Sequence, residues 1–571
     1  MKLFTNTFTQ GGQTQLHKLH MLQQIMGTTF KVSAGTGLLV FLIMVFWELT
    51  FNDLMIILSY EWASLVAEYG GRASLFKNVM FPFPEGKKVV SCLWLSQEPT
   101  ITHFVSLLWE KIIAGFLGGL TVSIITFCGT SYYWVNRGIK TKEKRILSGT
   151  EEVSDKNLAK LIRKKGEASD LSLAGVPLIK NKETSHMLII GTTGCGKTNA
   201  FHEILQQIRA RSQRAIIVDM TGVFVEKYYR SDIDKILNPR DVRSEKWTLW
   251  GECQTPSNQK GVASILIPDS GNPDGDYWVR SSRSLIIATM EKLQDMGELT
   301  TKKFFDYVSD KPLTKIQPFY EDTKAAVYVS KDSEKTAMGI RSNIRGCMES
   351  IELFEDTPYP FSIRDWVKND EGEDWLFLSS PPEITDEVAP LMNLWTSIAT
   401  EALKSMSRDL DRRLWVIIDE LPAIQKLPKL HTMLAEVRQR GGCVIIGTQD
   451  MCLLDKIYGY DIVKSISNLC STKVVFTIEG ADIAERMSRW LGVQEVSESV
   501  ENISYGANTI RDGVALNDMR KEKPTIHYDR LMKLPRLEAY LKVPGDYPVA
   551  KIKFKIHNLP KVADGFLESK Y

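Results

Sequence analysis

The chain has 571 residues, too many for a single hydrophobic core, so two or more domains are expected. Its formal net charge of +2 excludes binding of nucleic acid through a generally basic surface, so any such contact needs a local patch or a pore. The eight cysteines form no C-x-x-C pair and have no metal-ligand spacing with histidine. This pattern indicates reduced thiols rather than a disulfide framework, and it suggests no zinc site.

Two apolar segments near the N-terminus predict membrane-spanning helices, at residues 33–51 and 112–134. The first is apolar apart from Thr36 over most of its length, and the second carries no charge. The first segment, with its flanks, just reaches the roughly 20 residues that a helix needs to cross a bilayer, and the second is longer. The glycines of the second segment fall on or near one face, as close helix packing in lipid requires; they are Gly115, Gly118 and Gly119. The alternative is a pair of buried core helices, which the long uncharged second segment disfavours.

Basic residues set the expected orientation of these two segments. Lysines precede the first span, and a dense basic group follows the second; these residues are Lys18, Lys31, Arg137, Lys140, Lys142, Lys144 and Arg145. The positive-inside rule then places both termini in the cytosol. We therefore expect a two-pass inner-membrane protein with a cytosolic N-terminus (1–32), a periplasmic loop (52–111) and a cytosolic linker (135–156).

A phosphate-binding loop follows a short apolar strand in the cytosolic part. Residues 191–198 match G-x-x-x-x-G-K-T and precede a helical stretch. Such a loop wraps backbone N–H groups around phosphate, with Lys197 reaching the β- and γ-phosphates and Thr198 ligating Mg²⁺. The predicted cofactors are ATP and Mg²⁺. The predicted binding residues are Gly191, Thr192, Thr193, Gly194, Cys195, Gly196, Lys197 and Thr198. The alternative, a chance glycine turn, does not explain the strand–loop–helix context.

Two later strands are predicted to complete this site. The apolar run 414–418 ends in Asp419 and Glu420, which we expect to hold Mg²⁺ and to polarise the attacking water, respectively. The next apolar strand ends near Gln449, a candidate sensor of the γ-phosphate. The alternatives are solvated acids at a strand end and an ordinary strand-end cap. At the end of another strand, Asp219 is expected to cap a turn rather than to contact nucleotide.

The order of these elements predicts an α/β fold. Strands alternate with helices over 157–245 and 356–571, which favours a doubly wound parallel sheet, the nucleotide-binding domain. The intervening segment 246–355 has helical spacing and few strand-like runs, so it is expected to form an inserted all-α domain.

This combination resembles the TraD-like coupling proteins of type IV secretion, the TrwB/TraD/VirD family of conjugation ATPases. The resemblance covers nearly the whole chain and includes motifs beyond the phosphate loop. These motifs are Thr9-Gln-Gly-Gly-Gln13, Ile236-Leu-Asn-Pro239, Trp278-Val-Arg-Ser-Ser-Arg283, Lys335-Thr-Ala-Met-Gly-Ile-Arg341, Asp419-Glu-Leu-Pro422, Arg438-Gln-Arg-Gly-Gly442, Ser504-Tyr-Gly-Ala507 and Arg511-Asp-Gly513.

The resemblance implies a RecA-like P-loop NTPase with an all-α domain and an N-terminal two-helix transmembrane hairpin. It implies a homo-hexamer that couples a relaxase-bound DNA to a type IV secretion channel and helps pump single-stranded DNA. In this interpretation Lys197, Glu420, Arg438 and Gln449 are catalytic, Thr198 and Asp419 hold the metal, and Arg438 acts on the neighbouring subunit. The alternatives are a surface role for Arg438, and a receptor or scaffold, for DNA or for protein effectors, in which ATP mainly drives ring assembly.

DNA contact is expected from basic residues of the helical insert. The candidates for lining a channel are Arg280, Arg283, Lys335 and Arg341. Such a channel binds single strands by charge, with little preference for sequence and with strong salt dependence. The alternative is that these residues lie on solvated helix faces.

Overall fold

The computed structural model describes residues 2–71, 77–142, 145–269, 275–380, 382–428, 430–504 and 513–568. The chain divides into two compact units, one of residues 1–145 with 497–519 and one of residues 146–496 with 520–571. The segment 505–512, which holds most of the two last motifs named above, lies outside the described residues.

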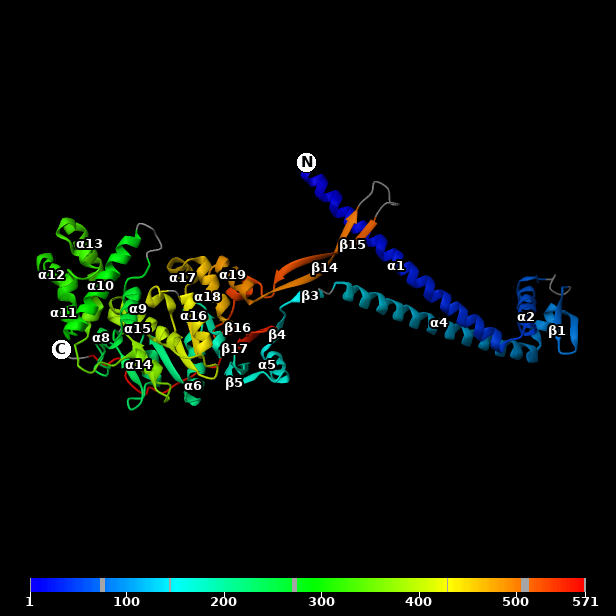
Figure 1. Ribbon diagram of the computed structural model, residues 1–571. Coiled ribbons are helices and arrows are strands. Elements are labelled where there is room, and N and C mark those ends of the chain that lie inside the picture. The colour runs from blue at the N-terminus through cyan, green and yellow to red at the C-terminus, as the bar shows by residue number, and fades with distance from the viewer. Residues whose placement is uncertain are drawn as a thin grey trace. The chain divides into compact units, whose positions relative to one another are not determined.

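The first unit contains the two apolar helices. They are α1 (Lys2–Glu48) and α4 (Pro99–Lys142), and they pack against each other (Figure 1). Within Leu19–Glu48 and Pro99–Ile139, stretches of 18 residues reach mean hydropathy 1.9 and 2.0, so both helices are long and apolar enough to cross a membrane. They form the predicted N-terminal two-helix transmembrane hairpin. Residue Glu48 ends α1 before the expected boundary at residue 51, because Thr50 caps the next helix.

Glycine permits the close packing of α1 and α4. A Cβ atom on Gly37 would lie 2.7 Å from the carbonyl oxygen of Gly119, and one on Gly119 would lie 2.6 Å from that of Gly37. Gly115 and Gly118 face Val45 and Met44. The predicted helix-packing face of the second span is therefore confirmed, since only residues without a Cβ allow the two backbones to approach this closely.

The segment between α1 and α4 folds into a small domain. Its elements are α2 (Phe51–Tyr69), β1 (Asn78–Phe83), β2 (Gly86–Ser91) and α3 (Cys92–Gln97). Strands β1 and β2 pair as an antiparallel hairpin. One face of α2 buries Ala63 and Val66 against Phe81 of the hairpin and Leu95 of α3.

The second unit is built on a ten-stranded sheet. The strand order is β4 (Glu152–Ser154), β17 (Val549–Lys553), β16 (Glu538–Lys542), β13 (Thr472–Val475), β7 (Met187–Ile190), β12 (Gly442–Thr448), β11 (Leu414–Ile418), β8 (Arg214–Asp219), β10 (Trp375–Ser379), β9 (Lys235–Leu237). All neighbours from β13 to β9 are parallel, as predicted, whereas β16 is antiparallel to both of its neighbours. The sheet is thus parallel in its centre and mixed at one edge.

Both faces of this sheet are covered, so its central strands are buried throughout. Alternate residues enter different cores: Leu188 and Ile190 join one hydrophobic cluster, and Met187 and Ile189 join the other. The covering helices are α5 (Asp155–Lys164), α6 (Lys197–Ala210), α7 (Val223–Tyr228), α14 (Ile363–Lys368), α15 (Thr385–Ser405), α16 (Leu430–Val437), α17 (Met451–Tyr458), α18 (Tyr460–Leu469), α19 (Ala481–Leu491) and α20 (Tyr528–Met532). Two smaller sheets pair β5 (Ala168–Leu173) with β6 (Val176–Ile179), and β3 (Arg145–Gly149) with β14 (Val493–Ser504) and β15 (Gly513–Pro524).

The predicted helical insert is confirmed over its described residues. Its helices are α8 (Leu249–Glu252), α9 (Pro256–Leu266), α10 (Asp276–Met296), α11 (Thr301–Phe305), α12 (Leu313–Tyr320) and α13 (Glu334–Met348). The chain enters and leaves the insert side by side, because Phe361 N donates to Lys246 O at 2.8 Å. The buried Glu252 carboxylate links the two connecting segments, because it accepts hydrogen bonds from Trp247 Nε1 and Ile363 N. Burial raises the pKa of Glu252 to about 7.

Candidate nucleotide-binding site

The loop 191–198 lies between β7 and α6, at the carboxyl edge of the parallel strands. Its glycines meet two steric demands. Gly194 and Gly196 have φ of +73° and +120°, which favours glycine, and a Cβ atom on Gly191 would lie 2.5 Å from Cβ of Phe476. The strand–loop–helix context predicted for this motif is therefore present in the structure.

Lys197 points back into this loop. Its Nζ donates to the carbonyl oxygens of Gly191 at 2.7 Å and Thr192 at 3.2 Å. Burial lowers the pKa of Lys197, while Cys195, Glu420 and Asp419 oppose that shift. The ammonium group is therefore close to both acids, and the hydroxyl-bearing Thr198 is exposed beside it.

Asp419 and Glu420 follow β11 and carry two unusual oxygens. Asp419 Oδ1 and Glu420 Oε2 are buried and have no hydrogen-bond partner among the described residues. Burial, with the nearby Asp219 carboxylate, raises the pKa of Asp419 to about 6, and burial raises that of Glu420 to about 7. Buried carboxylate oxygens without donors fit a hydrated cation, and carboxylates are the usual protein ligands of Mg²⁺. The donor set thus fits Mg²⁺ held partly by phosphate, although no group of three or more metal-binding side chains occurs in the described ranges.

Gln449 connects the phosphate loop to these acids. Its Oε1 accepts from Thr193 Oγ1 at 2.6 Å, and its backbone N–H donates to Glu420 Oε1 at 3.3 Å. The structure therefore brings together residues from the ends of β7, β11 and β12, as the sequence predicted. The nearby Asp219 accepts from Thr221, Phe224 and Val225 backbone N–H groups. Its predicted capping role is confirmed.

Arg438 lies at the other end of β12. It is exposed on a short turn (Arg438–Arg440) after α16, and its guanidinium makes no hydrogen bond or ion pair within the described part of the chain. Burial lowers the pKa of His186, which precedes β7, to about 4, and the charge of Arg438 contributes to this shift. The seven residues of β12 separate this edge from Gln449 by about 20 Å. The structure does not bring Arg438 to the phosphate loop of its own chain.

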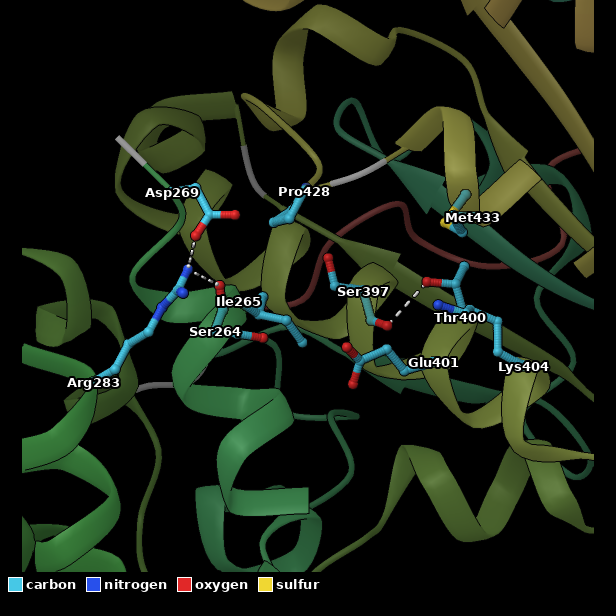
Figure 2. Close-up of a pocket in the computed structure, with 10 residues that line it drawn as sticks. All are labelled: Ser264, Ile265, Asp269, Arg283, Ser397, Thr400, Glu401, Lys404, Pro428 and Met433. Carbon is cyan, nitrogen blue, oxygen red and sulfur yellow. Dashed lines mark hydrogen bonds and ion pairs between the residues drawn. The ribbon is translucent and has the colours of Figure 1, made fainter. Parts of the chain in front are cut away.

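The basic residues proposed for a channel have different surroundings. Arg341 is buried and donates to the carbonyl oxygens of Val308 and Lys311, so its assignment as a channel residue is wrong. Arg283 pairs with Asp269 at 2.9 Å beside a cavity of about 200 Å³, and Figure 2 shows its side chain directed at that carboxylate. Arg280 and Lys335 are exposed. The sequence could not distinguish buried from exposed candidates, because the three arginines and the lysine occur in segments with similar helical patterns.

Sequence reasoning missed a contact beside the loop. Asn199, directly after Thr198, donates through Nδ2 to Lys555 O at 2.6 Å and accepts from His557 N at 2.9 Å. Leu537 N donates to Cys195 O at 2.8 Å. Residue 537 before β16 and residues 555–557 after β17 therefore clamp the loop and the start of α6. No local sequence signal marks this pairing, because its partners are separated by more than 350 positions.

The chain is similar to known proteins in sequence and in fold. A family model described as "Type IV secretion-system coupling protein DNA-binding domain" matches residues 170–555. Coupling protein TraD of Escherichia coli (strain K12) is 31% identical over 467 residues, which are 81% of this chain and 65% of TraD. The chain thus spans about two thirds of the length of this relative.

Solved structures of the conjugative coupling protein TrwB are also similar. Unbound TrwBdeltaN70 has 27% identity and a TM-score of 0.66, covering 74% of this chain and 97% of that one. TrwB in complex with ADP and Mg²⁺ has 26% identity and a TM-score of 0.66, covering 75% and 98%. The fold is accordingly a RecA-like P-loop NTPase with an inserted all-α domain. The chain belongs to the family of type IV secretion-system coupling proteins.

Proposed function

We propose that this protein is an inner-membrane ATPase that works as a homo-hexamer. It couples a relaxase-bound single strand of DNA to a type IV secretion channel and helps to pump that strand. Both termini lie in the cytosol. The family membership and the nucleotide complexes of TrwB support this proposal, as does the arrangement of residues around the phosphate loop.

Each residue of the loop has a role that its position favours. The backbone N–H groups of 191–198 bind the phosphates, and Lys197 exchanges its contacts with Gly191 and Thr192 carbonyls for the β- and γ-phosphates. Thr198 and Asp419 hold Mg²⁺, which when bound neutralises charge on the phosphates. Glu420 accepts the proton of the attacking water, and Gln449 senses the γ-phosphate through its contacts with Thr193 and Glu420.

The position of Arg438 carries the proposal of a multi-subunit enzyme. Phosphoryl transfer gains from a cation beside the transferring group, and Arg438 is too far from its own loop to supply one. An exposed guanidinium without a partner among the described residues is available to the phosphate site of a neighbouring copy. Hydrolysis in one subunit then depends on the placement of the next.

A mixing experiment tests this arrangement. Full-length Lys197→Ala and Arg438→Ala subunits, each inactive alone, are combined in lipid nanodiscs and assayed for ATP hydrolysis. Recovery of activity in the mixture is expected, because some interfaces pair an intact loop with an intact arginine. The control replaces the second partner with a Lys197→Ala/Arg438→Ala double variant, which cannot complement. Absence of recovery at every ratio would show that Arg438 does not act between subunits.

The scaffold alternative predicts a different outcome for Glu420→Gln, which is expected to bind ATP without hydrolysing it. A pump requires turnover, so this variant abolishes DNA transfer. A receptor that uses ATP only for ring assembly keeps substrate recruitment and some transfer. Binding of single-stranded DNA that weakens steeply with salt supports the contribution of exposed cations such as Arg280 and Lys335.

A further inference from the structure

One face of α2 exposes an uninterrupted apolar row. Its side chains repeat with spacings of four and three residues and are between 40% and 77% exposed. This row, the α2 stripe, consists of Phe51, Met55, Leu58, Trp62, Leu65 and Tyr69. The opposite face of the same helix already packs on the β1–β2 hairpin. Because the small domain leaves such a regular apolar face uncovered, another apolar medium is expected to cover it.

Two contacts fix the direction in which this face points. Tyr60 OH lies 2.9 Å from Thr102 Oγ1, whereas Trp109 Nε1 donates to Glu61 Oε1 at 2.7 Å. Thr102 and Trp109 are about 10 Å apart along α4, although Tyr60 and Glu61 are adjacent. Helix α2 therefore crosses α4 at a large angle. Its Glu61 side faces the membrane-spanning part of α4, and its Tyr60 side faces away from it.

The α2 stripe lies on the membrane side of this crossing. Leu58 and Leu65 are three and four residues from Glu61, so they flank it on the same helical face. Figure 1 shows α2 between the β1–β2 hairpin and the spanning helices. The stripe also continues the exposed apolar surface of α1, since Phe51 follows the end of α1 by three residues and Trp47 is 88% exposed.

We propose that the α2 stripe docks on the lipid bilayer, with α2 lying in the interface beside the membrane exit of α1 and α4. Aromatic residues such as Trp62 and Tyr69 suit this depth. A recess of about 320 Å³ beside the stripe offers space for an acyl chain; it is lined mostly by apolar residues such as Met55, Trp62 and Met80, with Lys87 of β2 at its wall. Helix α2 contains no lysine or arginine, so its attachment rests on apolar burial rather than on anionic headgroups.

Spin labels on the full-length protein test the proposal. Single cysteines are introduced as L58C and W62C, in a background where the exposed Cys128 and Cys452 are serine. The protein is placed in nanodiscs of phosphatidylethanolamine and phosphatidylglycerol. Collision rates of the label with oxygen, which concentrates in lipid, and with a polar nickel chelate are then measured. I43C on α1 serves as the lipid reference, and E85C at the hairpin turn as the solvent reference.

The expected result is an oxygen-to-nickel ratio at both stripe positions that resembles I43C and exceeds E85C. Ratios like that of E85C would mean that the stripe faces water, and they overturn the proposal. Low accessibility to both reagents, with spin–spin broadening at full labelling, would mean that a second copy covers the stripe, and this also overturns it. A third label, L65C, keeps the comparison intact if either of the other substitutions disturbs folding.

Discussion

Replacing Gly447 by alanine should damage the candidate site without touching any of its side chains. Gly447 lies in β12 beside the end of β11, and its Cβ atom would fall on the carbonyl oxygen of Asp419. It would also lie 2.9 Å from the carbonyl carbon of Asp419 and 3.0 Å from Cε2 of Phe201. Ordinary contacts begin at 3.4 Å, so Asp419 has to move by roughly 1 Å.

The size of the effect follows from this displacement. Overpacking of a rigid core costs about 1–3 kcal/mol, which lowers stability but leaves the protein folded. A shift of about 1 Å in a group that positions metal and water costs on the order of 10²-fold in turnover. We therefore expect Gly447→Ala to melt earlier than the parent protein, to retain nucleotide binding and to hydrolyse ATP roughly 100-fold more slowly.

Melting curves and steady-state ATPase rates of the full-length protein in nanodiscs measure both quantities. The matched control is Gly346→Ala in α13, where nothing lies within 4 Å of the new Cβ atom. That variant should retain full activity, and its free energy of unfolding should rise by about 0.5–1 kcal/mol, because alanine stabilises a helix relative to glycine. A Gly447→Ala protein with the parental melting temperature and rate would refute the reasoning that Asp419 is held in place by this contact.

Three further perturbations have defined outcomes. Burial raises the pKa of Glu420 from 4.5 to about 7, so ionisation of Glu420 destabilises the nucleotide-free protein. As pH rises across this range, the free energy of unfolding of the parent should therefore fall relative to that of Glu420→Gln. A difference between the two proteins that does not change with pH would contradict this. Gly119→Val should lower thermal stability by about 1–3 kcal/mol, whereas Gly129→Val, with open space around it, should not; equal losses would argue against close α1–α4 packing. Asn199→Ala should speed amide hydrogen exchange at His557 about tenfold, and unchanged exchange would mean that the clamp is dispensable.

Local patterns made much of the site predictable. The loop 191–198 needs its glycines for backbone conformation and its lysine for charge, so all its requirements lie within eight consecutive residues. Asp419, Glu420 and Gln449 were predictable because parallel strands end at the same edge of a sheet, and any polar residue there is placed near the loop.

Other features depend on contacts that no local pattern records. Arg341 belongs to the same helical periodicity as exposed Lys335, and only the carbonyl groups of Val308 and Lys311 explain its burial. The antiparallel direction of β16 depends on its pairing with β13 and β17, whereas its own sequence suits either direction. The hairpin β1–β2 was not predicted, because strands of six residues between apolar helical segments give a weak signal.

The separation of Arg438 from the phosphate loop bears on when the cell spends ATP on this protein. The two ends of β12 cannot be brought together without breaking the central sheet. Under the role proposed for Arg438, a solitary subunit therefore lacks the cation that completes its reaction centre. On this basis, newly inserted copies diffusing in the membrane would hold ATP without consuming it. ATP hydrolysis would begin only where subunits contact one another, so ATP would not be hydrolysed before the secretion system is assembled.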